Sequence, residues 1–286
     1  MSNQTSGGIA VEARQLQVNG LRYHVLDAGE GTPVLLLHGF PDTSELWRRQ
    51  IDALVAAGFR AIAPDLRGRG KTERPPNVAD YALSLIVRDV VGLLDALGVQ
   101  RAHVVGHDWG AAVAWLSAAL LPERVDRLVA ISVGYPGAAG RPKFEDLQKG
   151  WYRLLIQFAG VAEDLMQQDD WYLFRELLQG VGDVEQYIAN LSEPGALTAG
   201  FNWYRANLPP DRLLSAAQLP QVKAPTLGIW STGDLYLTER AMLASAAKVT
   251  GPWKYVRVEG ASHWIPIDAP DQLNDLILDF LSRTAE

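Results

Sequence analysis

Unbroken runs of apolar residues alternate with segments of helical periodicity along most of the chain. Apolar runs of this length are typical of strands that are buried on both faces of a parallel sheet. The five clearest runs cover residues 33–39, 61–65, 102–107, 127–133 and 225–231. The pattern therefore predicts an α/β fold in which a mostly parallel sheet carries helices on both of its faces.

Other segments add a hairpin and a helix to this sheet. Residues 14–20 and 21–29 predict an antiparallel hairpin closed at Asn19-Gly20, a residue pair that suits a tight primed turn. Residues 80–97 carry the clearest helical periodicity in the chain.

Three residues are expected to mark the ends of helices. Asp80 is expected to cap the helix over residues 80–97, and Gly98 is expected to end it in a left-handed conformation. Asp42 is expected to cap an earlier helix over residues 43–57.

The pattern changes between residues 135 and 220, where no convincing apolar strand occurs. This segment holds helical stretches, breaks at glycine and proline, and three tryptophans. A helical insertion late in a parallel sheet suits a lid, because ligands bind at the carboxyl ends of such strands. We therefore expect an α/β core formed by residues 1–134 and 221–286, and a helical cap formed by residues 135–220.

The composition excludes some kinds of site and partner and favours one cellular location. The 286 residues contain no cysteine, which excludes disulfides, thiolate metal sites and a cysteine nucleophile. The net charge of -7 is spread along the chain, which disfavours nucleic acid as a partner. Residues 1–10 lack the features of a signal peptide, and the longest apolar run, residues 110–121, is too short to span a bilayer. A cytoplasmic protein without a membrane anchor is therefore expected.

The stretch VVGHDWGA, residues 104–111, joins a predicted strand to a helix of small residues. Such a turn is a nucleophile elbow, which holds its central residue at the top of the sheet, and that residue is usually serine. Here it is Asp108, whose carboxylate is stabilised by the N-terminus of the following helix. A carboxylate suits the displacement of a leaving group from saturated carbon, which leaves an ester on the enzyme. Water must then hydrolyse that ester, and this step needs a base and an oxyanion hole.

Two residues that follow later strands suit the hydrolytic step. His263 comes after the last predicted strand, residues 254–258, and Asp234 comes just after residues 225–231. A histidine base needs a partner on its other ring nitrogen, and an aspartate supplies it. The chain order of nucleophile, acid and histidine is that of α/β-hydrolases.

The expected donors of the oxyanion hole are the backbone N–H groups of Phe40 and Trp109, because both residues follow strand ends. Each residue of the proposed triad also has a structural interpretation when it is taken singly: Asp108 as a helix-capping residue, His263 as a loop residue and Asp234 as part of a turn. Three such residues in this order, each after a predicted strand, favour a catalytic site.

Other polar residues near the strands receive structural interpretations. His24, His103 and His107 are interpreted as structural residues, and Asp65 is expected to hold its own loop. The sequence predicts neither a metal site nor a cofactor.

At these residues the chain resembles the α/β-hydrolase fold, and within it the epoxide hydrolases of the soluble type. The resemblance extends from about Leu16 to Leu281 and is carried by the motifs HGFPDTSELW, DLRGRG, GHDWG, GD and SHW. It implies the same nucleophile, acid, base and oxyanion donors as those named above. Haloalkane and haloacetate dehalogenases share these core motifs, so the cap has to separate the two reactions.

The leaving groups of the two reactions differ. An opening epoxide becomes a basic alkoxide and needs a proton, and a tyrosine, with an ordinary pKa of about 10, can donate one. The segment FNWYRAN resembles the one that carries a ring-opening tyrosine, which would be Tyr204, and GWYRLLIQFAGVAED resembles the one that carries the other, Tyr152. The pair favours an epoxide hydrolase that forms a vicinal diol. In the alternative interpretation both tyrosines only pack within an aromatic cap.

A haloalkane or haloacetate dehalogenase with the same triad is the alternative function. The indole N–H groups of Trp109 and Trp151 would then bind the halide. Against this, Phe40 stands where many haloalkane dehalogenases carry a halide-binding asparagine. No arginine follows the elbow where haloacetate dehalogenases place one for the substrate carboxylate.

We expect Trp151, Phe40 and Trp109 to line a pocket for a hydrophobic epoxide, which reacts with water without a cofactor. Trp151 and Arg153 flank Tyr152 with larger groups than the resemblance predicts, so the shape of the substrate stays open. The sequence also leaves open whether the chain forms a homo-oligomer.

Overall fold

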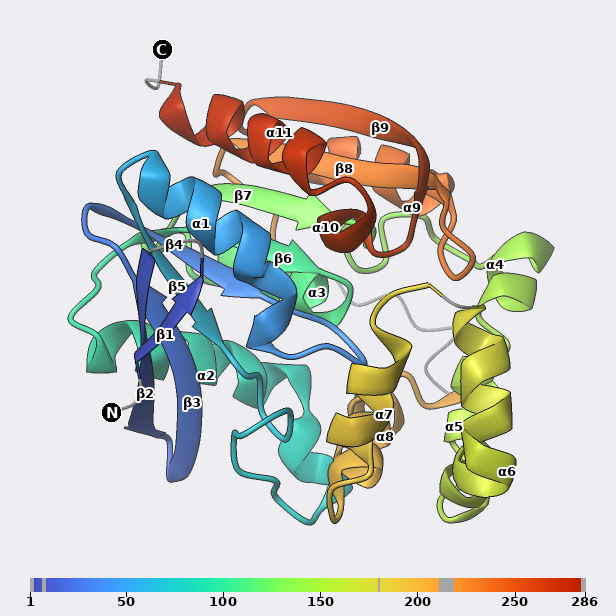
Figure 1. The fold of residues 1–286 in the computed structure, drawn as a ribbon. Helices are drawn as coiled ribbons and strands as arrows, with labels where there is room; N and C mark the ends of the chain where they lie inside the picture. Colours follow the sequence, from blue (N-terminus) through green and yellow to red (C-terminus); the bar gives the residue numbers. More distant parts are fainter. Residues whose placement is uncertain (1–2, 7–8, 180, 211–218, 284–286) are drawn as a thin grey trace.

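A single sheet forms the centre of the molecule (Figure 1). The computed structural model describes residues 3–6, 9–179, 181–210 and 219–283. Within these residues the sheet has nine strands in the order β1-β2-β3-β5-β4-β6-β7-β8-β9. In chain order they are β1 (Asn3–Ser6), β2 (Ile9–Val18), β3 (Leu21–Ala28), β4 (Thr32–Leu37), β5 (Phe59–Pro64), β6 (Ala102–His107), β7 (Val125–Ile131), β8 (Thr226–Gly233) and β9 (Trp253–Ser262).

Strands β4 to β9 are parallel, whereas β1, β2 and β3 form an antiparallel edge. Each of the five strands expected from an apolar run is present, so the prediction of a mostly parallel sheet is confirmed. The hairpin between β2 and β3 turns at Asn19 and Gly20, which have φ angles of 49° and 83°. Both values lie in the left-handed region that a primed turn requires, and the Asn-Gly pair adopts it at little cost.

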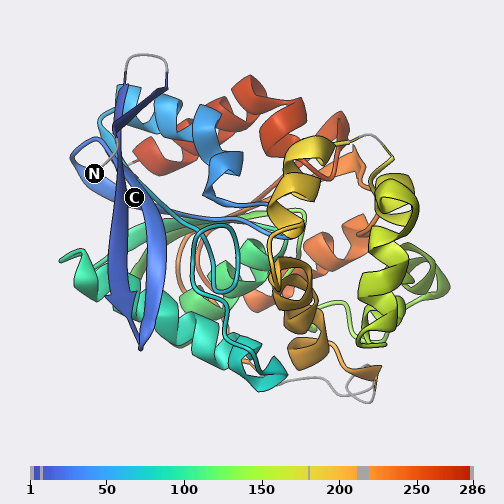
Figure 2. The same cartoon turned by 60° about the horizontal axis from the view of Figure 1, so that its bottom comes forward.

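Helices cover both faces of the sheet (Figure 2). Helices α1 (Arg48–Ala56) and α11 (Pro270–Ser282) pack together on one face, and α2 (Leu83–Ala96) and α3 (Trp109–Leu120) pack together on the other. Every residue of α3 except Leu120 is buried, which explains why this helix is apolar on all sides. Two short helices, α9 (Glu239–Ala244) and α10 (Ile265–Asp268), lie near the ends of β8 and β9.

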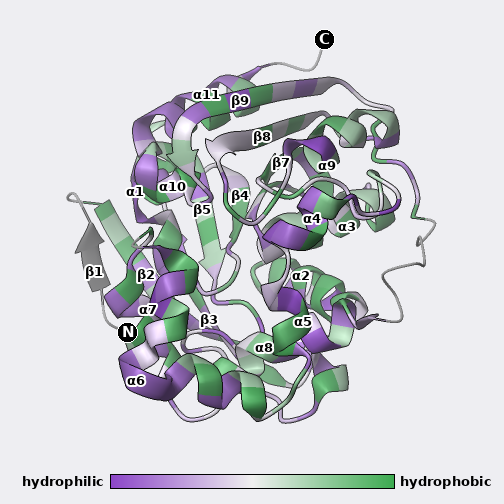
Figure 3. Ribbon diagram, turned by 90° about the vertical axis from the view of Figure 1, so that its right-hand side faces the viewer, coloured by the Kyte–Doolittle hydropathy of each residue, from purple (hydrophilic) through white to green (hydrophobic). Residues whose placement is uncertain are grey.

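Among the described residues between β7 and β8, five helices stand over the carboxyl ends of the parallel strands (Figure 1). They are α4 (Phe144–Lys149), α5 (Tyr152–Ile156), α6 (Val161–Leu178), α7 (Val184–Leu191) and α8 (Ala196–Asn207). Figure 3 shows hydrophobic and hydrophilic residues side by side on α5, α6 and α8, as expected of helices with one face on the core. We call this insertion the cap. Residues 180 and 211–218 of the predicted cap lie outside the described residues.

Two residues that were expected to begin helices as N-terminal capping residues, Asp80 and Asp42, do not do so. The helix predicted from residue 80 begins as α2 only at Leu83, because Asp80 belongs to a separate 3-10 turn, Val78–Tyr81, where its carboxylate accepts hydrogen bonds from Asn77. Asp42 does not cap a helix either. Its carboxylate is buried between the core and the cap, where the hydroxyl of Tyr187 donates to Oδ1 at 2.7 Å and the indole of Trp264 donates to Oδ2 at 3.0 Å.

Other local expectations are confirmed. Gly98 follows α2 with a φ of 68°, in the left-handed conformation expected of a residue that ends a helix. Asp65 holds its loop, since its carboxylate accepts from the backbone N–H groups of Ser44 and Lys71, each at 2.8 Å. In the part of the chain that the structure describes, no helix is both long enough and apolar enough to cross a membrane.

Candidate active site

Asp108 stands at the sharp turn between β6 and α3. Its φ of 52° and ψ of -122° are strained for a residue with a side chain. The turn is tight enough that a Cβ on Gly110 would lie 1.9 Å from the carbonyl oxygen of Leu37, and one on Gly39 would lie 2.3 Å from Oδ1 of Asp108. Only glycine fits at these two positions, which brings the loop after β4 against the carboxylate.

The two oxygens of Asp108 have different surroundings. Oδ1 accepts the backbone N–H of Phe40 at 2.9 Å, and Oδ2 faces the Nε2 atom of His263 at 3.7 Å. Burial raises the pKa of Asp108, but the adjacent His263 and the Phe40 N–H outweigh it and lower that pKa to about 2. Asp108 is therefore ionised at neutral pH, with Oδ1 held by the N–H of Phe40 and Oδ2 facing His263. Trp109 is the first residue of α3. That its backbone N–H is the second donor of the oxyanion hole stays a prediction.

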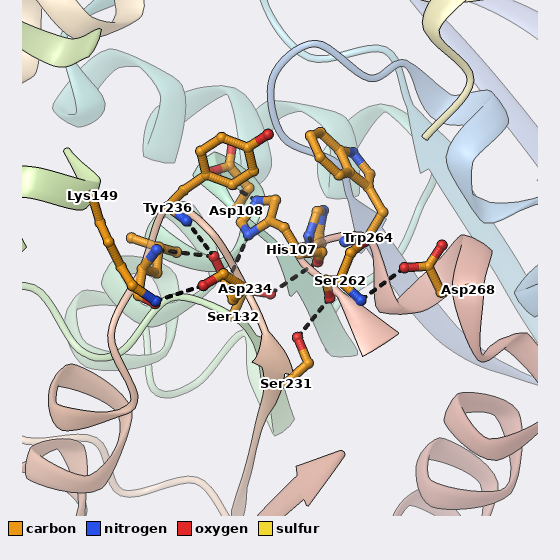
Figure 4. Close-up of polar contacts among 12 residues, drawn as sticks. His107, Asp108, Ser132, Lys149, Ser231, Asp234, Tyr236, Ser262, Trp264 and Asp268 are labelled. Atoms are coloured by element: carbon orange, nitrogen blue, oxygen red, sulfur yellow. Dashed lines mark hydrogen bonds and ion pairs between the residues drawn. The ribbon is translucent and has the colours of Figure 1, made fainter. Parts of the chain in front are cut away.

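His263 lies between two carboxylates. Its Nδ1 donates to Oδ2 of Asp234 at 2.8 Å, and Oδ1 of Asp234 accepts the backbone N–H groups of Tyr236 and Leu237 at 2.8 and 2.9 Å (Figure 4). Burial lowers the pKa of His263, but Asp234 and Asp108 raise it more strongly, to about 10. The ring is thus an imidazolium as long as both carboxylates are charged.

His107, beneath this triad, has a structural role, as interpreted from the sequence. Its Nε2 donates to the backbone carbonyl of His263 at 2.9 Å, and the hydroxyl of Ser132 donates to the same oxygen at 3.2 Å. Burial, together with the charge of His263, lowers the pKa of His107 to about 3. His107 is neutral and fixes the backbone of His263.

The two cap tyrosines meet above Asp108. Tyr152 begins α5 and Tyr204 lies in α8, and their ring centroids are 6.0 Å apart. Tyr204 also packs edge-on against Phe40 at 5.8 Å and against Trp109 at 5.0 Å. Burial raises the pKa of each tyrosine above its ordinary value, so both hydroxyls are protonated at neutral pH.

Two cavities reach Asp108 between the cap and the core. The larger has a volume of about 310 Å³ and the smaller about 30 Å³, and Asp108, Tyr152 and Tyr204 line both. Phe40 and His263 line the smaller cavity, and Trp109 lines the larger. The walls are otherwise mainly apolar, which suits an apolar substrate.

Trp151 is not a residue of this pocket, contrary to expectation. Its side chain is 45% exposed, lines neither cavity, and instead borders a surface hollow beside Leu173 and Leu235. The reason is helical geometry: Trp151 directly precedes α5, and since successive residues of a helix are rotated by about 100°, Tyr152 faces inward while Trp151 faces outward.

Three residues of the site were not singled out from the sequence as site residues. The ring of Tyr236 packs against His263 at 5.3 Å and against Tyr152 at 5.9 Å. Asp42 lies close enough to influence the site, and burial raises its pKa to about 7 despite the hydrogen bonds that it accepts. Lys149 of the cap donates to the backbone carbonyl of Asp234 at 2.6 Å. For Tyr236 a signal existed, because it follows the predicted acid by two positions.

Known proteins are similar to this chain in sequence and in fold. A family model described as "alpha/beta hydrolase fold" matches residues 32–270. The chain is 33% identical to epoxide hydrolase A of Mycobacterium tuberculosis over 94% of this chain and 97% of that protein. It is 34% identical to epoxide hydrolase 1 of Siraitia grosvenorii over 96% of this chain and 99% of that protein. The crystal structure of epoxide hydrolase VrEH1 from Vigna radiata is similar with a TM-score of 0.82 and 31% identity, over 96% of this chain and 98% of that one. The chain therefore belongs to the epoxide hydrolase family of the α/β-hydrolase fold.

Proposed function

We propose that this protein hydrolyses an epoxide to a vicinal diol by way of a covalent ester on Asp108. Membership of the family supports a small-molecule epoxide and water as the reactants. The observation that carries the proposal is the pair of protonated hydroxyls, Tyr152 and Tyr204, which line the same cavities as Asp108. Opening an epoxide requires such donors, whereas a departing halide does not require a proton.

In the first step Oδ2 of Asp108 attacks a carbon of the epoxide, since Oδ1 is held by the N–H of Phe40. A bond forms between that carbon and Oδ2, and the bond between the carbon and the epoxide oxygen breaks. Tyr152 and Tyr204 donate to the oxygen as its negative charge develops. The product of this step is a hydroxyalkyl ester of Asp108.

In the second step water hydrolyses the ester. Ester formation removes the negative charge that faced Nε2 of His263, so the pKa of the ring falls and the imidazolium releases its Nε2 proton, which replaces the proton donated by the tyrosines. The neutral ring can then take a proton from water. The water oxygen attacks the carbonyl carbon of Asp108, and the N–H groups of Phe40 and Trp109 stabilise the oxyanion on Oδ1. Asp234 stabilises the imidazolium that results. Collapse of the oxyanion breaks the bond between the carbonyl carbon and the alkyl oxygen, and His263 returns the proton to that oxygen as the diol leaves. The carboxyl group of Asp108 then gives its proton to His263, which restores the ion pair.

The dehalogenase alternative loses one of its expected halide donors, because the exposed Trp151 lines neither cavity at Asp108. Incubation with styrene oxide and, separately, with 1-chlorohexane tests the choice. We expect diol from the epoxide and no chloride from the haloalkane. Chloride release without diol formation would contradict the proposal, and the Asp108→Asn variant, inactive on both substrates, is the control for background hydrolysis.

A further inference from the structure

Arg153 places a positive charge in the larger cavity. It follows Tyr152 in α5, and its guanidinium carbon lies 5.7 Å from the ring centroid of Tyr152. Among the residues that line this cavity, Arg153 and Asp108 are the two that carry a charge. The other lining residues are polar but neutral, aromatic, aliphatic or glycine.

The partners of the guanidinium within the described residues are neutral, and the first of them is the side chain of Tyr152. Its Nη2 also donates a long hydrogen bond, 3.5 Å, to the backbone carbonyl of Tyr236. Within the described residues no carboxylate lies at ion-pair distance from it. By contrast, Arg67 is paired with Asp89 and Arg205 with Glu163, each at 2.7 Å.

A buried cation whose partners are all neutral is costly unless a ligand supplies the opposite charge. Asp108 does not fill this role, since its oxygens already face Phe40 and His263. A neutral epoxide needs no cation in the cavity. An anionic epoxide needs one, because Asp108 would otherwise repel it.

We propose that Arg153 binds a carboxylate on the substrate, so that the protein prefers epoxides that carry a carboxylate close to the ring. This inference rests on the proposed function and names its substrate class. The carboxylate must be close to the ring because Arg153 and the proposed ring-opening donor Tyr152 are neighbours on one helix and face the same cavity. A guanidinium suits this task, as its planar N–H groups can hold both carboxylate oxygens. The apolar walls near Leu83, Val133 and Leu208 then receive the hydrocarbon part of the substrate.

Two matched substrates test the assignment: trans-3-phenylglycidate, which carries a carboxylate, and trans-3-phenylglycidol, in which a neutral hydroxymethyl group replaces it. The Arg153→Met variant removes the charge and keeps the length of the side chain. We expect its kcat/KM to fall on the order of 10- to 100-fold for the glycidate. For the glycidol we expect a change below about threefold, and Arg153→Lys should recover part of the loss for the glycidate.

A matched control is Arg175→Met, which removes the same charge from α6 of the cap without touching either cavity. It should leave both rates nearly unchanged. If Arg153→Met slows both substrates equally, Arg153 acts through Tyr152 on ring opening and the assignment is wrong. The assignment is also wrong if the unmodified protein shows no preference for the glycidate.

A binding measurement separates this inference from the proposed function. If neither epoxide is hydrolysed, the proposed function fails, yet calorimetry with 3-phenylpropionate still tests the carboxylate site. We expect this anion to bind the unmodified protein at least 10-fold more tightly than it binds the Arg153→Met variant. Equal affinity for the two proteins would overturn the inference whatever the activity.

Discussion

The Nε2 atom of His263 lies 3.7 Å from the Oδ2 atom of Asp108, so the proposed base and nucleophile form an ion pair in the resting protein. The pair lowers the pKa of Asp108 to about 2. The pKa of His263 is raised to about 10 by Asp234 first and by Asp108 second. In the proposed mechanism the pair also gives the two steps an order, because we expect His263 to act as a base after Asp108 has lost its charge as an ester.

Removing the charge of Asp108 without alkylation should therefore lower the pKa of His263. The Asp108→Asn variant keeps the shape of the side chain, and we expect the pKa of His263 to fall by roughly one to three from its value in the unmodified protein. Nitrogen chemical shifts of selectively labelled histidine measure it, with His107 as an internal reference that stays neutral. An unchanged pKa at His263 would mean that Asp234 alone sets it.

The same pair should make stability decline in alkaline solution. His263 has a pKa of about 10 in the folded protein and an ordinary value of 6.5 when unfolded, so its stabilising contribution is complete below pH 6.5 and is lost as the pH rises toward 10. One such group contributes a slope of up to about 1.4 kcal/mol per pH unit in this window. Urea unfolding between pH 6 and pH 10 measures the free energy of unfolding, and in the His263→Gln variant this free energy should depend less on pH. Parallel curves for the two proteins would contradict this expectation.

The two cap tyrosines should contribute to ring opening. Tyr152→Phe and Tyr204→Phe each remove one hydroxyl from a buried ring, and we expect each to lower the rate of ester formation by about 10- to 100-fold. The double variant should lower it further. Stopped-flow quenching of tryptophan fluorescence follows the ester, since Trp109 adjoins Asp108. If both single variants form the ester at the rate of the unmodified protein, the two tyrosines have a packing role only.

Asp42 should contribute to the docking of the cap. It accepts hydrogen bonds from Tyr187 of α7 and from Trp264 of the core, and both donors are buried. Asp42→Ala leaves two donors without a partner, which should lower the free energy of unfolding by about 2–4 kcal/mol, whereas Tyr187→Phe should lower it by about 1 kcal/mol. Urea unfolding at pH 8 compares them. A loss for Asp42→Ala no greater than that for Tyr187→Phe would show that the bond from Trp264 contributes little.

The sequence predicted the features that depend on local pattern. Apolar runs indicated the parallel strands, and the small residues around Asp108 indicated the elbow, because close approach of backbones restricts which residues fit there. The order of Asp108, Asp234 and His263 placed all three after strands, and parallel strands bring such residues to one edge of the sheet.

Features that depend on distant contacts or on the side of a short helix were not predictable. The prediction that Asp42 caps a helix is wrong because its true partners, Tyr187 and Trp264, lie 145 and 222 positions away in the sequence. The prediction that Trp151 lines the pocket is wrong, and the sequence could not correct it, because no periodic pattern shows which side of the five-residue helix α5 faces the core. The inward orientation of Arg153 was unpredictable for the same reason.

The most direct test of the account is a search for the ester on Asp108. In His263→Gln the base is absent, so the ester should form and persist after mixing with styrene oxide. Mass spectrometry of the peptide that contains Asp108 should then show an added mass equal to that of the epoxide, and Asp108→Asn should show none. An unmodified Asp108 in a folded His263→Gln protein, while the unmodified enzyme converts the same epoxide to diol, would contradict the central claim.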